Sequence, residues 1–397
     1  MTRRQEFGFG LALLLLCTLG ITGSLAATCS IGDRDALLAF KNQLTDSSGL
    51  LANWMKGTDC CTWTGIRCNA QAKVIEIYIE ATCKGCGPNG QFLIAKNTNN
   101  FGKSLATLRP TLKTLALINV QVQLKFPIPP TFFTLTNLNY LNLESCEFIG
   151  SIPKELGNLV NLEELRINGN KFSGGMPDSI GKLQKLKVLE LRDNQAPTLG
   201  SSQITLLKKL TTFDYQRNKV TGPLPKWLGG LSVGTLTLAG NQFSGPISPE
   251  LCKLRALQYL LLRGNKLSGS IPGCIGNVAL LFYLDVGRNM LSGPLPRELG
   301  KLKQLTRFLA DNNRITGPLP REIGDLPTLF FIEIQNNKIT GRIPSNYGPS
   351  DPIAIDPINF TNNMLSGPIP PGYQNLDETA FRPGNPGLCG PPLSNPC

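Results

Sequence analysis

Nearly the same stretch of residues recurs through most of the chain at an almost constant spacing. Residues 162–177 read LEELRINGNKFSGGMP, and residues 257–272 read LQYLLLRGNKLSGSIP. One asparagine marks each unit, and successive asparagines are 24 residues apart, except for one interval of 23 and a last one of 26. These residues are Asn170, Asn194, Asn218, Asn241, Asn265, Asn289, Asn313, Asn337 and Asn363. A period of this length predicts units that stack in one direction, each burying its apolar side against its neighbours.

Each position of the repeated template LxxLxLxxNxxSGxIPxxLGxL has a physical reason. The leucines of LxL are expected to point inward from a short strand. The asparagine amide offers donors and an acceptor to backbone groups where the chain turns. The glycine accepts backbone angles that other residues resist, and the proline fixes the next extended step. The pattern predicts an α/β solenoid of leucine-rich repeats over residues 73–370, with Val120 and Cys146 at the asparagine position of two weaker units.

Residues 1–26 have the layout of a cleaved secretory signal. Arg3 and Arg4 precede the apolar stretch LALLLLCTLG (11–20), and small residues follow in SLAAT (24–28). No later stretch reaches the ~18–20 continuous apolar residues of a membrane helix. The chain ends at Cys397 without the hydrophobic tail of a lipid-anchor signal. We therefore expect a secreted protein with no integral membrane segment.

Two segments are expected to cover the open ends of the solenoid. In residues 27–72, GDRDALLAFKNQL (32–44) places Ala36, Leu37, Phe40 and Leu44 at helical spacing, with Asp33 positioned to cap the helix. The cluster DCCTWTGIRC (59–68) follows. Residues 371–397, which end in FRPGNPGLCGPPLSNPC, form the expected C-terminal cap.

The cysteine count predicts one unpaired thiol. Without Cys17 of the signal, eleven of the 12 cysteines remain, and an odd number leaves at least one unpaired. Adjacent cysteines rarely bond to each other, because that geometry strains the peptide between them. The expected pairs are Cys29–Cys60, Cys61–Cys68, Cys83–Cys86, Cys252–Cys274 and Cys389–Cys397, which leaves Cys146 free.

These motifs together resemble plant extracellular leucine-rich-repeat proteins. The segments that carry the resemblance are CSIGDRDALLAFK, WxxxxxCCxWxGIxC, the GxIP-type repeats and the GLCGPPL ending. The chain is similar to the polygalacturonase-inhibiting proteins and to the secreted DNA-damage-toleration-like group. The resemblance implies a right-handed, curved superhelix of 24-residue plant-type GxIP repeats with disulfide-bonded caps. The chain departs from this pattern in the enlarged stretch 83–100 and in 196–206, which lacks the GxIP step, and it lacks the inhibitors' further C-terminal cysteine pair.

The sequence argues against an enzyme. The chain has no histidine, which excludes Ser-His-Asp and Cys-His catalysis and most zinc sites. Glu190 and Asp214 are one unit apart, so their strands should lie roughly 5 Å from each other, close to the carboxyl separation of a retaining glycosidase. No aromatic-lined cleft accompanies them, and Cys83–Cys86 lacks the βαβ setting of a redox motif. We expect no catalytic residue, no metal and no cofactor.

Recognition by the concave sheet is the expected activity. The residues that flank the inward leucines include Tyr259, Tyr283 and Phe331 beside Arg263 and Arg307, with Glu190 and Asp214 further along the same face. Exposed aromatic residues beside arginines are typical of interface hot spots. The alternative is that single surface aromatics have no binding role.

The net charge of +12 suggests a polyanion as a second partner. Part of the charge is periodic, because Lys171, Lys219, Lys266, Arg314 and Lys338 each follow the asparagine of their unit. Such a basic ridge could hold the protein on acidic wall pectin. Nucleic acid is not expected, since the signal and the disulfides indicate an extracellular protein. Asn359-Phe-Thr361 is a sequon for N-linked glycan on the concave side of the last unit.

The sequence therefore predicts a secreted, non-enzymatic recognition protein of the plant cell wall or cell surface. The expected ligand is a protein, either a secreted glycosidase or a cell-surface receptor, and inhibition of a microbial polygalacturonase is the most specific form of this hypothesis. Two alternatives stay open. The chain could be an extracellular receptor or co-receptor partner in peptide signalling, or a pectin-binding wall protein.

Overall fold

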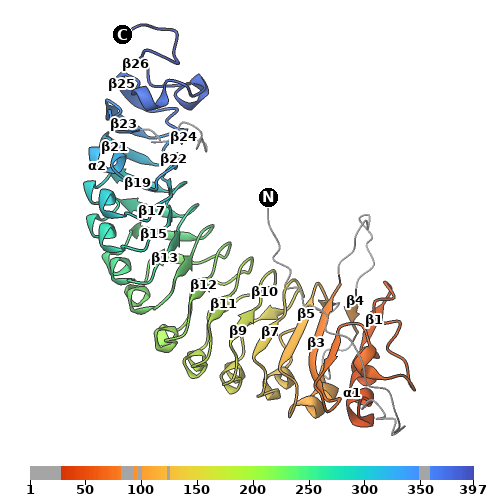
Figure 1. Ribbon diagram of the computed structural model, residues 1–397. Coiled ribbons are helices and arrows are strands. Elements are labelled where there is room, and N and C mark those ends of the chain that lie inside the picture. Colours follow the sequence, from red (N-terminus) through yellow and green to blue (C-terminus); the bar gives the residue numbers. More distant parts are fainter. Residues whose placement is uncertain (1–27, 82–92, 97–100, 123–125, 348–357) are drawn as a thin grey trace, which may run out of the picture.

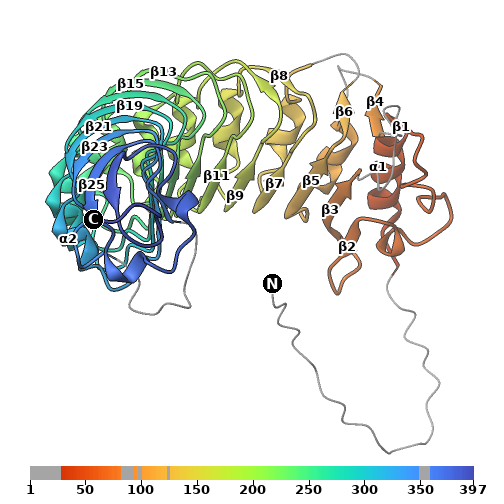
Figure 2. The same cartoon turned by 90° about the horizontal axis from the view of Figure 1, so that it is seen from above.

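The repeats stack as coils of a curved solenoid (Figure 1). The computed structural model describes residues 28–81, 93–96, 101–122, 126–347 and 358–397. The expected signal and the Cys83–Cys86 pair lie outside the described residues. From above, the coils follow one continuous arc from the N-terminal helix α1 (Ile31–Lys41) to the C-terminal coils (Figure 2). No described helix combines the length and apolar character needed to cross a bilayer.

The inner side of the arc is one 13-stranded sheet of the described residues. Apart from the antiparallel first pair, its strands run parallel, and each pairs with the strand of the next coil at the repeat spacing. In the three-residue parallel strands from β7 to β22 the middle residue, such as Leu260, is buried between coils. The strands are β2 (Ile66–Cys68), β3 (Val74–Glu80), β5 (Thr114–Ile118), β7 (Tyr140–Asn142), β9 (Glu164–Arg166), β11 (Val188–Glu190), β12 (Thr212–Asp214), β14 (Thr235–Thr237), β16 (Tyr259–Leu261), β18 (Tyr283–Asp285), β20 (Arg307–Leu309), β22 (Phe331–Glu333) and β24 (Ile358–Asn359).

Short helical turns line the outer side of the arc, most of them of the 3-10 type. Several begin directly after the proline of the repeat, for instance after Pro272 and Pro296, because a proline before the first turn lacks only an N–H that the helix would not use. They are η2 (Lys103–Leu108), η3 (Pro130–Thr134), η4 (Lys154–Asn158), η5 (Asp178–Lys182), η6 (Ser202–Leu206), η7 (Lys226–Gly230), η8 (Pro249–Lys253), η9 (Gly273–Asn277), η10 (Arg297–Lys301) and the α-helix α2 (Arg321–Gly324).

The SGxIP steps of the C-terminal coils form a second parallel sheet, which the sequence pattern did not predict. The glycine of this step has a positive φ, 72° at Gly269 and 75° at Gly293, so a side chain there would strain the backbone. The strands are β13 (Thr221–Pro223), β15 (Gln242–Pro246), β17 (Lys266–Gly269), β19 (Met290–Gly293), β21 (Arg314–Pro318), β23 (Lys338–Gly341), β25 (Met364–Pro368) and β26 (Gly387–Cys389). Smaller sheets join β1 (Leu44–Asp46), β4 (Leu93–Ala95) and β6 (Gln121–Val122), and β8 (Ile149–Gly150) with β10 (Lys171–Phe172).

The asparagines form a ladder of hydrogen bonds inside the turns, as the sequence predicted. Asn170 Nδ2 donates to the carbonyl of Leu143 in the preceding coil (2.8 Å) and to that of Ile167 in its own coil (3.1 Å). Its Oδ1 accepts from the backbone N–H of Phe148 (3.0 Å). Cys146 replaces this asparagine in an earlier coil, where its buried thiol points at the carbonyl of Leu117 (3.0 Å). The thiol is unpaired in the structure.

The N-terminal cap packs Ala36, Leu37 and Phe40 of α1 against the first coils. The expected cap residue is wrong: Ser30 is the N-cap, and its hydroxyl accepts from the backbone N–H of Asp33. The Asp33 carboxylate instead accepts from the backbone N–H of Val74 (3.1 Å) and so ties the helix to β3.

Disulfides bond both caps, as expected. The N-terminal cap contains Cys29–Cys60 and Cys61–Cys68 around η1 (Cys60–Thr62), and the C-terminal cap contains Cys389–Cys397. The last coil continues through η11 (Pro371–Tyr373) and η12 (Glu378–Ala380). On the outer side, Cys252 of η8 is bonded to Cys274 of η9.

Candidate concave recognition site

Four residues of neighbouring inner strands form one row across the concave sheet. The strand register places Tyr259 beside Tyr283, Tyr283 beside Arg307 and Arg307 beside Phe331. All four side chains are partly exposed. The Arg307 guanidinium lies over the Phe331 ring, 4.8 Å from its centroid. Burial raises the pKa of Tyr283, and the nearby Asp285 carboxylate adds to the effect. We call these four residues the aromatic row.

The sheet fixes the aromatic row, so it is a preformed surface. The middle residues of its strands, Leu260, Leu284 and Phe308, are buried and hold the strands in register. Such a row offers a ligand flat aromatic surface and one cation. The protein loses little side-chain entropy when a ligand binds, because the two tyrosines are already partly packed.

Arg263, expected in the same site, has a different environment. Its guanidinium donates two hydrogen bonds to the carboxylate of Asp311, two coils away (2.6 and 2.8 Å), and lies 3.4 Å from Asp285. Asp311 is fully buried. Gly287 lies between the two partners, and a Cβ there would overlap both Arg263 Nη1 and Asp311 Oδ1. Arg263 therefore binds the protein's own acids across a gap that only glycine leaves open.

Glu190 and Asp214 are register neighbours, as expected, but arginines surround them. Glu190 Oε1 accepts from Arg166 Nη1 (2.7 Å), and Oε2 accepts from Arg192 Nη2 (3.3 Å) and Asn168 Nδ2 (3.0 Å). The side chains of both acids are nearly covered. The Glu190 carboxylate is therefore occupied by the protein's own side chains.

Asp214 is the more weakly compensated of the two acids. Burial raises its pKa to about 6, even though the backbone N–H of Gln216 (3.1 Å) and the Arg192 guanidinium (3.7 Å) favour the charged form. The charge of this part of the concave face therefore changes in mildly acidic solution.

Phe282, directly before Tyr283 of the aromatic row, was not among the residues predicted from the sequence. Its side chain is 39% exposed, and its ring centroid is 5.7 Å from that of Tyr259. The signal was present in VALLFYLDV (278–286), where the neighbouring units have Gln258 and Thr306 at the position of Phe282. Most other units have a polar residue at this position and only the unit of β22 has a second aromatic one, Phe330, so an aromatic residue here is the pattern that would have revealed it.

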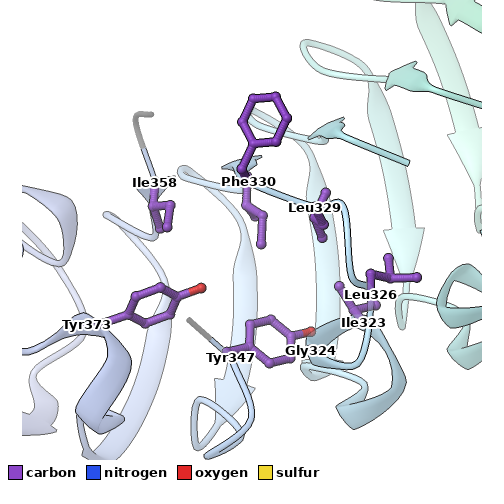
Figure 3. A pocket seen from close by; sticks show the side chains of 9 residues that line it. Ile323, Gly324, Leu326, Leu329, Phe330, Tyr347, Ile358 and Tyr373 are labelled. Atoms are coloured by element: carbon purple, nitrogen blue, oxygen red, sulfur yellow. The ribbon is translucent and has the colours of Figure 1, made fainter. Parts of the chain in front are cut away.

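A small, partly open cavity lies between the coil of β22 and the last coil, and Figure 3 shows its lining. Its volume is about 20 Å³, which is room for roughly one water molecule. The Tyr347 hydroxyl donates to the carbonyl of Pro320 (2.9 Å), and in Figure 3 Phe330 points away from Tyr347 and Tyr373. The cavity is too small for an organic ligand, so the open concave face is the better candidate site.

The basic ridge is separate from the aromatic row. Lys266, Arg314 and Lys338 are the first residues of β17, β21 and β23, in the second sheet. Lys171 is the first residue of β10 and pairs with Glu147 (2.8 Å), and Lys219 lies just before β13. Neutral residues such as Gln242 separate most of these cations, and only Arg314 and Lys338 lie in successive coils.

Asn359 lies at the end of the inner sheet, in β24 beside Glu333. Its Oδ1 accepts from the backbone N–H of Thr361 (3.0 Å) and from the Thr361 hydroxyl (2.8 Å). Its side chain is partly exposed on the last inner strand, one strand from Phe331 of the aromatic row.

Comparison with protein families identifies two kinds of segment. Residues 30–69 match the leucine-rich-repeat N-terminal domain, and residues 137–159, 161–183 and 256–278 match the leucine-rich repeat. Neither is a catalytic domain.

Curated relatives come from plants and match parts of the chain. Receptor-like protein EIX2 of Solanum lycopersicum is 32% identical over 165 residues, which are 39% of this chain and 15% of the relative. Polygalacturonase inhibitor 1 of Oryza sativa subsp. japonica is 26% identical over 135 residues, 34% of this chain and 36% of the relative. The chain thus spans a small part of the length of the receptor-like relative.

One similar solved structure is the Arabidopsis receptor kinase HAESA in complex with the peptide hormone IDA and the co-receptor SERK1. HAESA superposes on this chain with a TM-score of 0.68 at 27% sequence identity. The match covers 86% of this chain and 59% of that one.

Proposed function

Because the chain is a leucine-rich-repeat protein of the plant extracellular type, we propose that it is a non-enzymatic recognition protein whose concave face binds a secreted protein or peptide. The observation that carries the proposal is the aromatic row, Tyr259, Tyr283, Arg307 and Phe331, held in register by the sheet. Aromatic and arginine side chains dominate binding energy at interfaces. A place of action in the cell wall or at the cell surface belongs to the same proposal.

The aromatic row suits a peptide or a protein loop better than a large flat partner. It lies on the inner side of a curved solenoid, where an extended segment can contact several coils at once (Figure 1). The HAESA likeness covers most of the chain and supports a receptor or co-receptor role in peptide signalling. We take this role as the leading form of the proposal.

Inhibition of a microbial polygalacturonase is the second form of the proposal. It is supported by the partial match to the rice inhibitor. The direct assay is residual activity of a purified endopolygalacturonase at increasing concentrations of this protein. A dose-dependent loss of activity that the change Tyr283→Ala removes would favour inhibition, and unchanged activity at saturating protein would favour the receptor role.

Retention on pectin is a separate proposed property, carried by the basic ridge. Exposed charges contribute little each and are screened within about 10 Å at 0.1 M salt. The replacement of Lys171, Lys219 and Lys266 by Gln should therefore weaken retention on homogalacturonan beads, while the aromatic row keeps its protein ligand.

The test of the concave site uses a ligand captured from wall extract and identified by mass spectrometry. The variant Tyr259→Ala/Tyr283→Ala should lose at least about 2 kcal/mol of its binding free energy, as expected for a hot spot. The lysine-to-glutamine variant serves as the control and should bind that ligand normally. A tyrosine variant that binds as tightly as the parent protein would place the site elsewhere.

A further inference from the structure

One lateral edge of the solenoid changes character along the chain. This edge is formed by the residues that lead from the outer turns into the inner strands. In the N-terminal coils it is polar and internally bonded: Asn139 Nδ2 donates to the carbonyl of Asn161 (3.2 Å), and Lys187 pairs with Glu163 (2.6 Å). In the coil of β18 the corresponding residues are apolar and open to solvent, with Leu280 48% and Phe282 39% exposed.

The backbone fixes these two side chains in their outward positions. The N–H of Phe282 donates to the carbonyl of Gln258 (2.8 Å), and the carbonyl of Phe282 accepts from the backbone N–H of Thr306 (2.9 Å). Leu281, between them, is fully buried and anchors the segment in the core. The chain cannot turn Leu280 and Phe282 inward without breaking these contacts, so their exposure belongs to the folded state.

The exposed Phe282 forms one surface with a neighbouring ring, and the exposed Leu280 is two residues before it in the same coil. Phe282 packs against Tyr259 with 5.7 Å between ring centroids, at the start of β16. An apolar surface that the fold holds open and surrounds with polar residues marks an interaction site more often than scattered single residues do. Leu280, Phe282 and the ring of Tyr259 are called the edge patch below.

The border of the edge patch is positive. Arg255 and Lys303 come just before this edge in the coils on either side, and both are exposed. Arg255 Nη1 makes only a long hydrogen bond to the carbonyl of Asn277 (3.4 Å). The acid of this edge in the N-terminal coils, Glu163, is paired with Lys187. The charge around the patch therefore suits an acidic partner.

We propose that the edge patch is a docking surface for an acidic protein segment that carries aromatic or aliphatic side chains. The apolar residues would supply the binding energy, and the two cations would steer and orient the acidic segment. This surface shares the Tyr259 ring with the aromatic row, but Leu280 and Phe282 lie outside that row, so the edge patch extends beyond the concave site proposed above.

The test uses a labelled twelve-residue peptide in which Glu and Asp alternate with Leu and Phe, and a second peptide with Lys in place of the acids. Fluorescence anisotropy is measured at 50 and 300 mM salt. The acidic peptide should bind, with weaker binding at high salt, and the basic peptide should not. The variant Leu280→Ser/Phe282→Ser should weaken binding at least tenfold. Val160→Ser is the matched control, because Val160 is 47% exposed near the same edge of a polar coil, and it should have no effect.

A charge-reversal variant keeps the test independent of stability. Arg255→Glu/Lys303→Glu changes only exposed side chains and should reverse the preference toward the basic peptide. Tyr283→Ala should leave binding of the acidic peptide intact, although it should weaken binding of the ligand of the concave face. The proposal is overturned if the acidic peptide does not bind, if the Leu280/Phe282 variant binds as well as the Val160 variant, or if charge reversal does not change the preference.

Discussion

The buried ion pair between Arg263 and Asp311 allows the sharpest test of how the concave face is built. Asp311 is fully buried, while the side chain of Arg263 is 27% exposed. Replacement of Arg263 by Ala removes both donors of the bidentate pair, and the Asp311 carboxylate keeps a hydrogen bond from Asn312 Nδ2 (2.6 Å). The variant thus leaves a buried charge with much less compensation.

The expected cost follows from the geometry. Removal of one partner of a fully buried ion pair costs about 3–5 kcal/mol. The partial exposure of Arg263 and the remaining Asn312 donor reduce this, so we expect Arg263→Ala to lower the free energy of unfolding by about 2–3 kcal/mol. Gly287→Ala should act in the same direction, because the added Cβ would overlap both partners.

The assay is urea unfolding followed by far-UV circular dichroism, with two comparison variants. Lys253→Ala breaks an exposed pair with Glu250 (2.7 Å) and should change stability by less than about 0.5 kcal/mol. Arg263→Met/Asp311→Leu removes both charges of the pair and should regain part of the loss, since apolar replacement of a buried pair is often neutral, while Asp285 still lacks its contact with Arg263. An Arg263→Ala variant as stable as the parent, or a double variant no better than the single one, would refute this account.

Three further predictions concern single residues of the described chain. The pKa of Asp214 is raised from 3.8 to about 6, so between these pH values the folded protein binds more protons than the unfolded chain, and its stability falls as the pH rises. Asp214→Asn should reduce this fall in the free energy of unfolding by up to about 2–3 kcal/mol between pH 4 and 7, and an unchanged pH dependence would contradict the prediction. Burial raises the pKa of Cys146 to about 12, so iodoacetamide at pH 8 should label this thiol only after unfolding, and a disulfide to Cys146 found by peptide mapping would overturn the assignment. Protein produced in plant cells should lose mass on enzymatic deglycosylation, and Asn359→Gln should abolish that shift, whereas a native protein with no shift would show that the sequon is unoccupied.

The sequence by itself determined the architecture. The 24-residue period, the inward leucines and the turn asparagines are local features that recur in each coil, so the solenoid and the hydrogen bonds of Asn170 could be predicted without knowledge of distant contacts. The cysteine count and spacing likewise predicted the disulfides of both caps. The aromatic row could be listed from the sequence because register follows the repeat.

The tertiary structure alone decided which charged residues of the concave face are already engaged. Arg263 contacts Asp311, 48 residues away, because Gly287 leaves the space between them empty, and Glu190 is held by Arg166 from the preceding coil. These contacts depend on how side chains of successive coils fill the inner side of the sheet, which no single repeat specifies. The open position of Phe282 has the same origin, since a repeat pattern fixes where a residue stands and only the neighbouring coils decide whether it is covered.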